Sequence, residues 1–323
     1  MVEGEFTLAI KRRLDALDLD IRVVILGESV RKDYLSVYGY PHNNAPFLNS
    51  ANGVFIDGFI APSYNTPSSV PLLFGLNLNG GKTNYANSVV RLANNAGFET
   101  YWISNQGTRN AAFDTRSSLF ANQALHTEYI GSKTMEIRDD FDLFDYFDRA
   151  LDDRVDKPKI IFLHMYGSHN DPCGRLHGFS NRYNLPYGDS FNCYLATIEK
   201  LDIFIKTLID KMNTRQKSWA LLYLSDHGLL HSGEKTSVKF KHTGTAKQSY
   251  EVPFFALDCN DKEHIIIKRQ VSGLKFFDFF SVWIGYDTDA SDPNYTMRDF
   301  PQSVNIKTPK GDYAKLYDDP ALY

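Results

Sequence analysis

The chain has 323 residues, 43% of them hydrophobic, and a formal net charge of −4. This length is enough to bury a large core in one or two α/β domains, and the modest charge argues against a nucleic-acid partner. No run approaches the roughly 18 apolar residues that span a bilayer, so the sequence predicts a soluble protein or the soluble part of a longer one.

Short apolar runs alternate with helical patterns along the chain. Residues 6–20, FTLAIKRRLDALDLD, form an amphipathic segment that reads either as a linker helix leading in from a missing membrane region or as a surface helix. The strands expected after it are RVVIL (22–26), GVFIDGFI (53–60), TYWIS (100–104), KIIFLHMY (159–166), WALLYLS (219–225) and VPFFAL (252–257). Helices are expected at 86–96, 142–151, 194–212 and 273–283, and a loop-like region after 287. This alternation predicts an α/β fold, with a mostly parallel sheet sandwiched by helices in a single domain over 21–323.

Polar side chains follow four of these strands. They are Glu28 after the first, Thr66 to Ser69 after the second, His164 and His169 around the end of KIIFL, and Asp226 and His227 after WALLYLS, with His242 further along in KFKHTGTAKQSYEVPFF. Because the carboxyl ends of parallel strands share one edge of a sheet, we expect these groups to converge there. Carboxylate oxygens and imidazole nitrogens are ligands for zinc.

The same set of groups suits a transfer reaction. A threonine or serine hydroxyl is a weak nucleophile that a metal can activate, and the metal also polarises a phosphoryl or sulfuryl oxygen. Histidines nearby can hold the transferring group or protonate the leaving oxygen. An acyl-transfer triad fits less well, because the chain has no GxSxG sequence and the adjacent pair Asp226 and His227 suits two metal ligands better than a relay.

Each residue also has an ordinary structural reading. Glu28 alone could be a cap or an ion-pair partner, and the pair Asp226 and His227 a turn with a hydrogen-bonded histidine. His164 could be a core histidine, and the segment from Thr66 to Ser69 a helix N-cap. It is the occurrence of all these groups at successive strand ends that favours a catalytic site.

Three cysteines are too few for a disulfide scaffold, and none forms a CxxC pair. Cys173 and Cys193 flank a segment rich in Gly, Pro and Asn. They are therefore either a disulfide, which an oxidising compartment permits, or two unpaired thiols.

Six segments between about residues 22 and 255 carry a wider pattern. They are VVILGESVRKDYLSVYGYPHNNAPFL, APSYNTPSSVPLLF, YWISNQGTRNAAFD, FLHMYGSHNDP, YLSDHG and KHTGTAKQSYEVPFF. In this order they resemble the catalytic domain of the phosphoethanolamine transferases, in the alkaline phosphatase and sulfatase superfamily. GES followed by GY and a proline is the specific part, whereas LSDHG is shared by much of the superfamily. The resemblance implies an alkaline phosphatase-like α/β/α sandwich.

The resemblance also implies roles for individual residues. The matched zinc ligands are Glu28, Thr66, Asp226 and His227, and Thr66 matches the threonine that becomes phosphoethanolaminylated. Catalytic and substrate-binding roles near the phosphate or a second metal fall to His164, His169 and His242, and Asn105 in YWISNQG is expected at the substrate. The family has an N-terminal transmembrane region, which implies a domain at the periplasmic face of the bacterial inner membrane. In such a domain we expect a bridge between Cys173 and Cys193 over the active-site edge and a free Cys259.

The match is incomplete around the nucleophile. The family often reads GTxTAxSVPC, whereas this chain reads YNTPSSVPL, and the spacing from Asp226 to His242 is longer than usual. A sulfatase would carry C/S-x-P-S-R. Here Asn65 stands at the nucleophile position and Ser69 at that of the arginine, which argues against a sulfatase.

The sequence therefore predicts a zinc-dependent transferase. The resemblance implies transfer of phosphoethanolamine from phosphatidylethanolamine to lipopolysaccharide, at lipid A, a core sugar or another glycan, through a phosphothreonine. The alternatives are a phosphodiesterase or sulfatase-type hydrolase, a phosphoglycerol transferase of the same superfamily, and a non-catalytic binding domain. The acceptor, the number of metal ions and the oligomeric state stay open.

Overall fold

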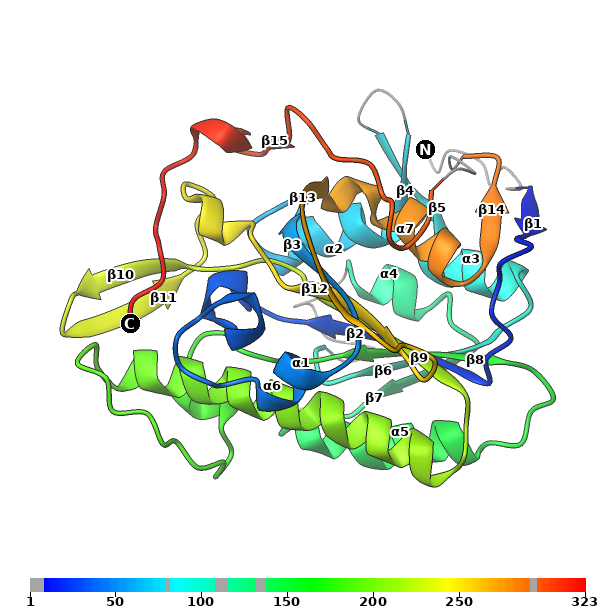
Figure 1. The fold of residues 1–323 in the computed structure, drawn as a ribbon, viewed down its shortest axis with the longest axis horizontal. Coiled ribbons are helices and arrows are strands. Elements are labelled where there is room, and N and C mark those ends of the chain that lie inside the picture. Colours follow the sequence, from blue (N-terminus) through cyan, green and yellow to red (C-terminus); the bar gives the residue numbers. More distant parts are fainter. Residues whose placement is uncertain (1–8, 79–81, 108–115, 132–137, 291–294) are drawn as a thin grey trace.

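An eight-stranded sheet lies at the centre of the computed structural model, which describes residues 9–78, 82–107, 116–131, 138–290 and 295–323 (Figure 1). The strands lie in the order β13-β3-β12-β9-β2-β8-β6-β7. Their bounds are β2 Ile21–Gly27, β3 Gly53–Ile60, β6 Glu99–Ser104, β7 His126–Tyr129, β8 Lys159–His164, β9 Trp219–Ser225, β12 Phe254–Asp258 and β13 His264–Ser272. Only β12 runs antiparallel to its neighbours, β3 and β9. The predicted α/β fold with a mostly parallel sheet is confirmed.

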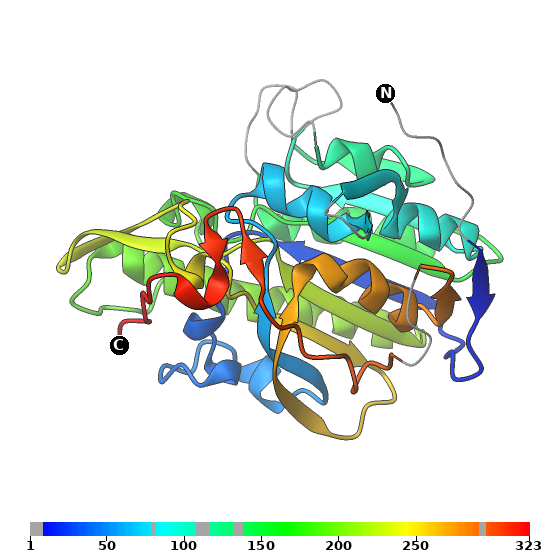
Figure 2. The same cartoon turned by 90° about the horizontal axis from the view of Figure 1, so that it is seen from above.

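Helices cover both faces of this sheet (Figures 1 and 2). One face carries α1 Pro46–Ser50, α5 Leu143–Asp152 and α6 Asp189–Thr214, and the other α2 Thr66–Phe74, α3 Val89–Asn95, α4 Ser118–Ala121 and α7 Phe276–Trp283. Side chains alternate along β2, so that Val23 and Ile25 join the first core and Val24 and Leu26 the second. Burial on both faces is why the central strands are continuous apolar runs.

Four short antiparallel pairs lie outside the large sheet. They are β1 Ile10–Arg12 with β14 Tyr286–Thr288, β4 Gly75–Leu78 with β5 Lys82–Ser88, β10 Leu230–Glu234 with β11 Ser237–Lys241, and β15 Lys307–Thr308 with β16 Gly311–Asp312. The β10–β11 hairpin projects at one end of the molecule, and β1 lies at the other (Figures 1 and 2). Among the described helices, none combines the length and the apolar character that crossing a bilayer requires.

Several predicted element bounds were wrong. The segment expected to be helical at the start of the chain contains strand β1, which pairs with β14 near the other end of the chain. Residues 86–88 belong to β5, so α3 begins only at Val89, where the Ser88 side chain accepts from the Arg91 amide as N-cap. Helix α6 begins five residues before the predicted start, and residues 273–275 form a 3-10 turn ahead of α7.

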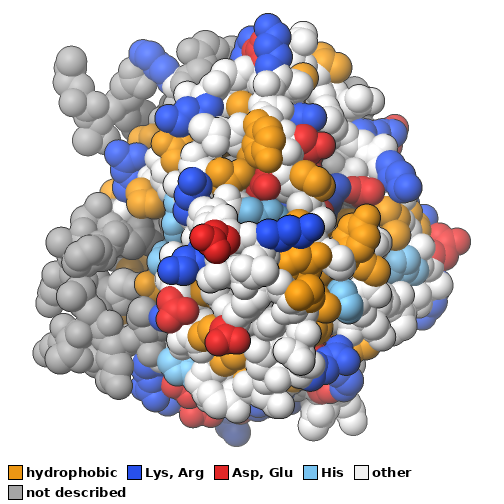
Figure 3. Space-filling model, turned by 90° about the vertical axis from the view of Figure 1, so that its left-hand side faces the viewer, with side chains coloured by type: hydrophobic (Ala, Val, Ile, Leu, Met, Phe, Trp, Pro, Cys, Tyr) orange, Lys and Arg blue, Asp and Glu red, His pale blue; other side chains and the backbone are white. Residues whose placement is uncertain are grey.

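The order of strands decides where functional groups meet. In the pairing of β2 with β9, Gly27 lies opposite Ser225, and in the pairing of β2 with β8, Leu26 lies opposite His164. Residues that follow these strands therefore leave the sheet side by side at its carboxyl edge. Figure 3 shows the molecule from the side toward which these strand ends point, and histidine side chains reach the surface there between hydrophobic and basic ones.

The predicted disulfide is present between Cys173 and Cys193, and Cys259 is free. Cys173 lies four residues after His169, and Cys193 lies in the first turns of α6, so the bridge fixes the loop behind this histidine to the helix. Thiol counting in denaturant without reductant is expected to give one reactive thiol per chain, and three after reduction. The bridge spans 20 residues, so Cys193→Ser should lower the free energy of unfolding by about 3 kcal/mol. Three reactive thiols before reduction would contradict the pairing.

Asp202 on α6 provides a pH-dependent contribution to stability. It is 2% exposed, and its carboxylate accepts hydrogen bonds from the amides of Phe47 and Leu48, each at 2.9 Å. Burial raises the pKa of Asp202 to about 6, although these two amides work in the opposite direction.

The stabilising contribution of this proton is therefore present below about pH 4, the unfolded pKa, and is lost as the pH rises through 6. We expect the unfolding free energy of the wild type to fall by up to about 3 kcal/mol relative to Asp202→Asn over this interval. Urea titrations of both proteins at pH 4, 5, 6 and 7 test this, and parallel pH profiles would contradict it.

Candidate active site

Glu28 forms the centre of a buried polar cluster at the end of β2. Its side chain is 1% exposed and accepts hydrogen bonds from Ser29 Oγ at 2.5 Å and from Gln106 Nε2 at 3.0 Å. Ser29 has a φ of 62°, an unusual value for a residue with a side chain. Backbone strain of this kind is held in place by the surrounding structure and is common at functional sites.

Thr66 reaches this cluster from the start of α2. The N-cap of the helix is Asn65, whose side chain accepts a hydrogen bond from the Ser68 amide, and Thr66 is the first helical residue. The N-cap therefore lies one residue before the segment from Thr66 to Ser69, in which it was expected. Thr66 Oγ1 donates to Glu28 Oε2 at 2.7 Å and lies 3.4 Å from His227 Nε2. The hydroxyl thus lies between two groups at the sheet edge and at a helix N-terminus, where the amides favour an anion.

The two neighbouring serines have other surroundings. Ser69 is fully buried and its hydroxyl donates to the Asp226 carbonyl at 2.5 Å. The Ser68 amide takes part in the cap. Of the three hydroxyls on this turn, that of Thr66 is the one hydrogen-bonded to Glu28.

Asp226 and His227 leave the adjacent strand β9. Asp226 Oδ1 accepts from the amides of Ser29 and His227, at 3.2 and 2.8 Å. His227 Nδ1 lies 2.8 Å from the Gly228 carbonyl, and its Nε2 lies 3.1 Å from Glu28 Oε1 and 3.4 Å from Asp226 Oδ2. A side chain at Gly228 would place its Cβ 2.0 Å from the Gln248 carbonyl oxygen, which explains the glycine after this pair.

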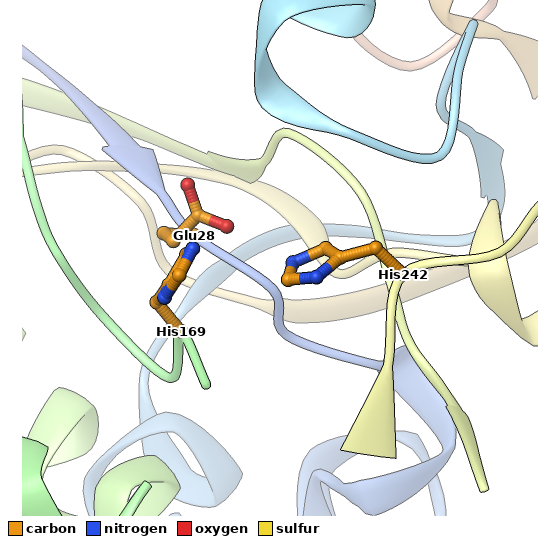
Figure 4. Close-up of side chains that lie close together, drawn as sticks. All are labelled: Glu28, His169 and His242. Carbon is orange, nitrogen blue, oxygen red and sulfur yellow. The ribbon is translucent and has the colours of Figure 1, made fainter. Parts of the chain in front are cut away.

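Two further histidines, His169 and His242, lie close to Glu28. The ring of His242, from the segment after β11, points toward Glu28 and His169 (Figure 4). The ring centroids of His169 and His242 are 5.2 Å apart, and those of His227 and His242 are 5.0 Å apart. Two groups of possible metal ligands result, Glu28 with Asp226 and His227, and Glu28 with His169 and His242. Within each, the ligand atoms lie within 4.8 Å of one another.

Burial and mutual charge shift the pKa values in the cluster. Burial and the Glu28 charge raise the pKa of Asp226 to about 7. Burial lowers the pKa of His227, but Asp226 and Glu28 outweigh it and raise the value to about 9. Burial opposes ionisation of Glu28, yet its pKa is well below the ordinary value because His227 lies beside it. Burial and the charge of His227 lower the pKa of His242 to about 4, so this imidazole is neutral near neutral pH.

The residues around Glu28 fit a metal ion. Asp226 Oδ2 is buried and has no hydrogen-bond partner, although it points at the same region as Glu28 and His227. Two buried carboxylates beside each other repel unless a cation or a proton lies between them. Two carboxylates and an imidazole make a ligand set that zinc accepts.

Two residues predicted at the site lie behind it. His164 is 1% exposed at the end of β8, with Nδ1 3.0 Å from Ser104 Oγ, and it belongs to neither ligand group. Asn105 is 3% exposed, and its Nδ2 donates to the Arg138 carbonyl and to Asp140 Oδ1, both at 2.8 Å. These hydrogen-bond partners lie outside the two ligand groups, and the substrate contacts expected of both residues stay predictions.

Sequence analysis missed Gln106, which does contact the cluster. Its Nε2 donates hydrogen bonds to Glu28 Oε2 and to the Met165 carbonyl oxygen, and its backbone amide donates to Ser104 Oγ at 3.0 Å. Ser104 therefore links His164 to Gln106, and through it to Glu28. The available signal was its position directly after Asn105 in a segment already assigned to the site.

Comparison with known proteins places this site in a family. A sequence model of the sulfatase family, described simply as "Sulfatase", matches residues 21–286. The chain belongs to the sulfatase family. The sulfatase-family match contains every residue of the two ligand groups, as well as Thr66.

Among relatives of known name, this sulfatase-family chain is similar to phosphoethanolamine transferase OpgE of Escherichia coli K12. The two are 34% identical over 270 residues, which cover 81% of this chain and 50% of OpgE. The chain thus spans about half the length of this relative.

Two solved structures share the fold. One is the C-terminal periplasmic domain of EcEptC from E. coli in complex with Zn, with a TM-score of 0.77, 20% identity and 96% coverage of each chain. The other is the integral membrane protein lipooligosaccharide phosphoethanolamine transferase A from Neisseria meningitidis, with a TM-score of 0.68 and 18% identity, covering 88% of this chain and 58% of that one. At these identities the likeness shows the fold alone.

Proposed function

We propose that this chain is the catalytic domain of a zinc-dependent phosphoethanolamine transferase. The observation that carries the proposal is the position of Thr66, whose hydroxyl donates to Glu28 within the buried group that also contains Asp226 and His227. The similarity to OpgE supports this choice of reaction within the family.

In the proposed site, Glu28, Asp226, His227 and the Thr66 hydroxyl would hold one zinc ion. When bound, zinc would lower the pKa of the hydroxyl and neutralise charge on the phosphoryl oxygens. The unpaired Asp226 Oδ2 and the mutual repulsion of two buried carboxylates are what the metal would compensate. Gln106 and Ser29 would hold Glu28 in orientation from behind.

The first half-reaction transfers the group to the protein. Thr66 Oγ1 attacks the donor phosphorus, and its proton passes by way of Glu28 Oε2, with which it is already hydrogen-bonded, to the departing donor oxygen. The bond from phosphorus to the donor glycerol oxygen breaks, and this oxygen leaves with a proton as diacylglycerol. The donor would be phosphatidylethanolamine and the intermediate a phosphothreonine.

The second half-reaction returns Thr66 to its starting state. An acceptor oxygen attacks the phosphorus, the bond to Thr66 Oγ1 breaks, and the acceptor proton returns to this oxygen. His242, which is neutral near neutral pH, suits accepting a hydrogen bond from the ethanolamine or the acceptor. His169, whose ring centroid lies 5.2 Å from that of His242, would help to hold the phosphoryl group.

The acceptor would be a lipopolysaccharide sugar or phosphate, and the domain would face the periplasm from the inner membrane. The support is indirect. One structure with this fold is a periplasmic domain and another is an integral membrane protein. The disulfide between Cys173 and Cys193 fits an oxidising compartment.

The test separates a transferase from a hydrolase of the same family. The zinc-loaded chain, mixed with a short-chain phosphatidylethanolamine, is expected to release about one equivalent of diacylglycerol and then nearly stop. A transferase intermediate must survive in water until an acceptor arrives. Adding lipopolysaccharide should restart turnover. Sustained release of free phosphoethanolamine without acceptor would establish a hydrolase, and phosphatidylglycerol used in preference would establish a phosphoglycerol transferase.

A further inference from the structure

Arg22 is a buried charge without a counter-ion, far from the active site. It lies at the start of β2 and is 3% exposed. Its Nη2 donates to the Leu17 carbonyl at 2.8 Å, and its guanidinium carbon lies 5.2 Å from the centroid of the Phe98 ring. Its Nε is buried and has no hydrogen-bond partner. Within the part of the chain that the structure describes, Arg22 makes no ion pair with a carboxylate.

Such an arrangement is costly for an arginine. A buried charge destabilises a protein unless it is paired, and arginine keeps its proton where other groups would release theirs. Burial lowers the pKa of Arg22 to about 10, which still leaves it charged near neutral pH. Asp18 and Asp258 favour the charge from a distance. However, the Asp18 side chain is 94% exposed and is already paired with Arg12 at 2.6 Å.

Arg22 lines a cavity of about 780 Å³ at the amino ends of the parallel strands. This volume is in the range of small-molecule sites. Apolar residues of the lining include Leu17, Phe98 and Ile284, and the first two contact Arg22. A second cavity of about 350 Å³ also has Leu17 and Arg22 in its lining, so the loop that carries Leu17 separates two cavities.

The lining of the cavity contains six basic and five acidic residues. Three acidic residues of the lining have partners of their own. Asp20 accepts from Ser218, Asp152 from Arg215, and Asp153 from the Tyr101 hydroxyl. Among the basic ones, Lys159 donates to three carbonyl groups at the end of α5, which do not neutralise it. Lys157 and Lys217 lie at the exposed rim, where Lys157 pairs with Glu99 at 3.7 Å and Lys217 with Asp20 at 4.0 Å.

We propose that this cavity binds a small organic anion, whose phosphate-like or carboxylate head pairs with Arg22 and whose apolar part lies against Leu17, Phe98 and Ile284. The binding site is separate from the candidate active site. Arg22 and Glu28 lie six residues apart along one extended strand, which separates them by about 20 Å at about 3.3 Å per residue. The anion could be the head of an amphiphile or a free soluble ion, and the probes distinguish these two sources.

The experiment is calorimetric titration of the full 323-residue chain in its zinc-loaded form with hexylphosphonate, inorganic phosphate and hexanol. Hexylphosphonate is chosen because its carbon–phosphorus bond resists hydrolysis at the active site. The key variant is Arg22→Met, which removes the charge and keeps the apolar stem. The matched control is Arg269→Met, since Arg269 lies on β13, outside the lining of the cavity, and pairs with Asp299.

We expect Arg22→Met to weaken hexylphosphonate binding at least tenfold, because a charge-assisted hydrogen bond is lost, and Arg269→Met to leave it unchanged. Zinc content should be equal in all three proteins. Ligand-free Arg22→Met should melt at or above the wild-type temperature, because an unpaired buried charge has been removed. Arg22→Gln, which can still donate to Leu17, provides the same binding test should the methionine variant not fold.

Each remaining outcome counts against the proposal. Equal affinity for hexanol would show that the charge is not used, and equal affinity for inorganic phosphate would exclude the role of the apolar wall. Unchanged hexylphosphonate binding in Arg22→Met and Arg22→Gln would show that any bound anion lies elsewhere. A lower melting temperature together with unchanged binding would assign Arg22 a purely structural role through Leu17.

Discussion

Replacing Thr66 with alanine is expected to lower turnover at least about a thousandfold while the fold and the metal site persist. The reason is the position of the Thr66 hydroxyl next to Glu28. Thr66 Oγ1 is the hydroxyl hydrogen-bonded to Glu28 Oε2, and no atom of alanine can take its place. The side chain is only partly buried, and losing one hydrogen bond should cost about 1 kcal/mol of stability. Rates of diacylglycerol release, melting temperature and zinc content, measured together, test this prediction.

Two further variants make this test specific. Thr66→Ser keeps the attacking oxygen and should retain measurable turnover. Ser68→Ala removes a neighbouring hydroxyl on the same helical turn and should be close to the wild type. Donor-treated protein, digested and analysed by mass spectrometry, should carry its adduct on Thr66. An adduct on Ser68 or Ser69, or full activity in Thr66→Ala, would mean that the nucleophile has been misassigned.

Strands that appear as short apolar runs could be predicted from the sequence. The apolar run of β9 and the mostly apolar run of β3, which Asp57 interrupts, coincide with the observed strands at both ends, because burial on two faces favours apolar side chains. Convergence of Glu28 with Asp226 also followed, because parallel strands end at one edge and β2 pairs directly with β9. Both predictions rest on rules that hold whatever the rest of the chain does.

Where prediction from the sequence was wrong or incomplete, the deciding contact is distant or depends on the path of a loop. The amphipathic start of the chain pairs as β1 with β14, a partner nearly at the opposite end of the sequence. Asn105 and Gln106 are adjacent and chemically alike, and the turn after Ser104 decides which of them faces Glu28. His164 and His169 are separated in the same way, because the first still lies in β8 and the second lies in the loop beyond it.

The unpaired charge of Arg22 shows a different limit. In the sequence it is one basic residue at the start of an apolar run, which is an ordinary strand boundary. Only the packing of Phe98 and of the loop carrying Leu17 shows that the guanidinium is enclosed. Whether a buried charge has a counter-ion depends on tertiary packing, which the sequence alone does not give.

Replacing Asp226 is expected to abolish zinc retention, with a loss of affinity of at least about a hundredfold, since even residues that only support a ligand cost ten- to a hundredfold. Asp226→Asn is the more informative variant because it can keep the acceptor that receives the Ser29 and His227 amides and removes only the charge. Asp226→Ala removes both. Metal analysis after dialysis against a weak chelator, with Asp202→Asn as a buried carboxylate control outside the cluster, gives the result directly.

The stability of the metal-free protein provides the second half of this test. In excess chelator, Asp226→Asn should melt at or above the wild-type temperature, because it removes one of two like charges that are buried side by side. With zinc present the order should reverse, because a metal that binds only the folded state raises the stability of the wild type. A structural aspartate would instead destabilise both forms when it is replaced. Full zinc occupancy in Asp226→Ala would remove Asp226 from the ligand set, and with it the reason why its second oxygen is buried without a partner.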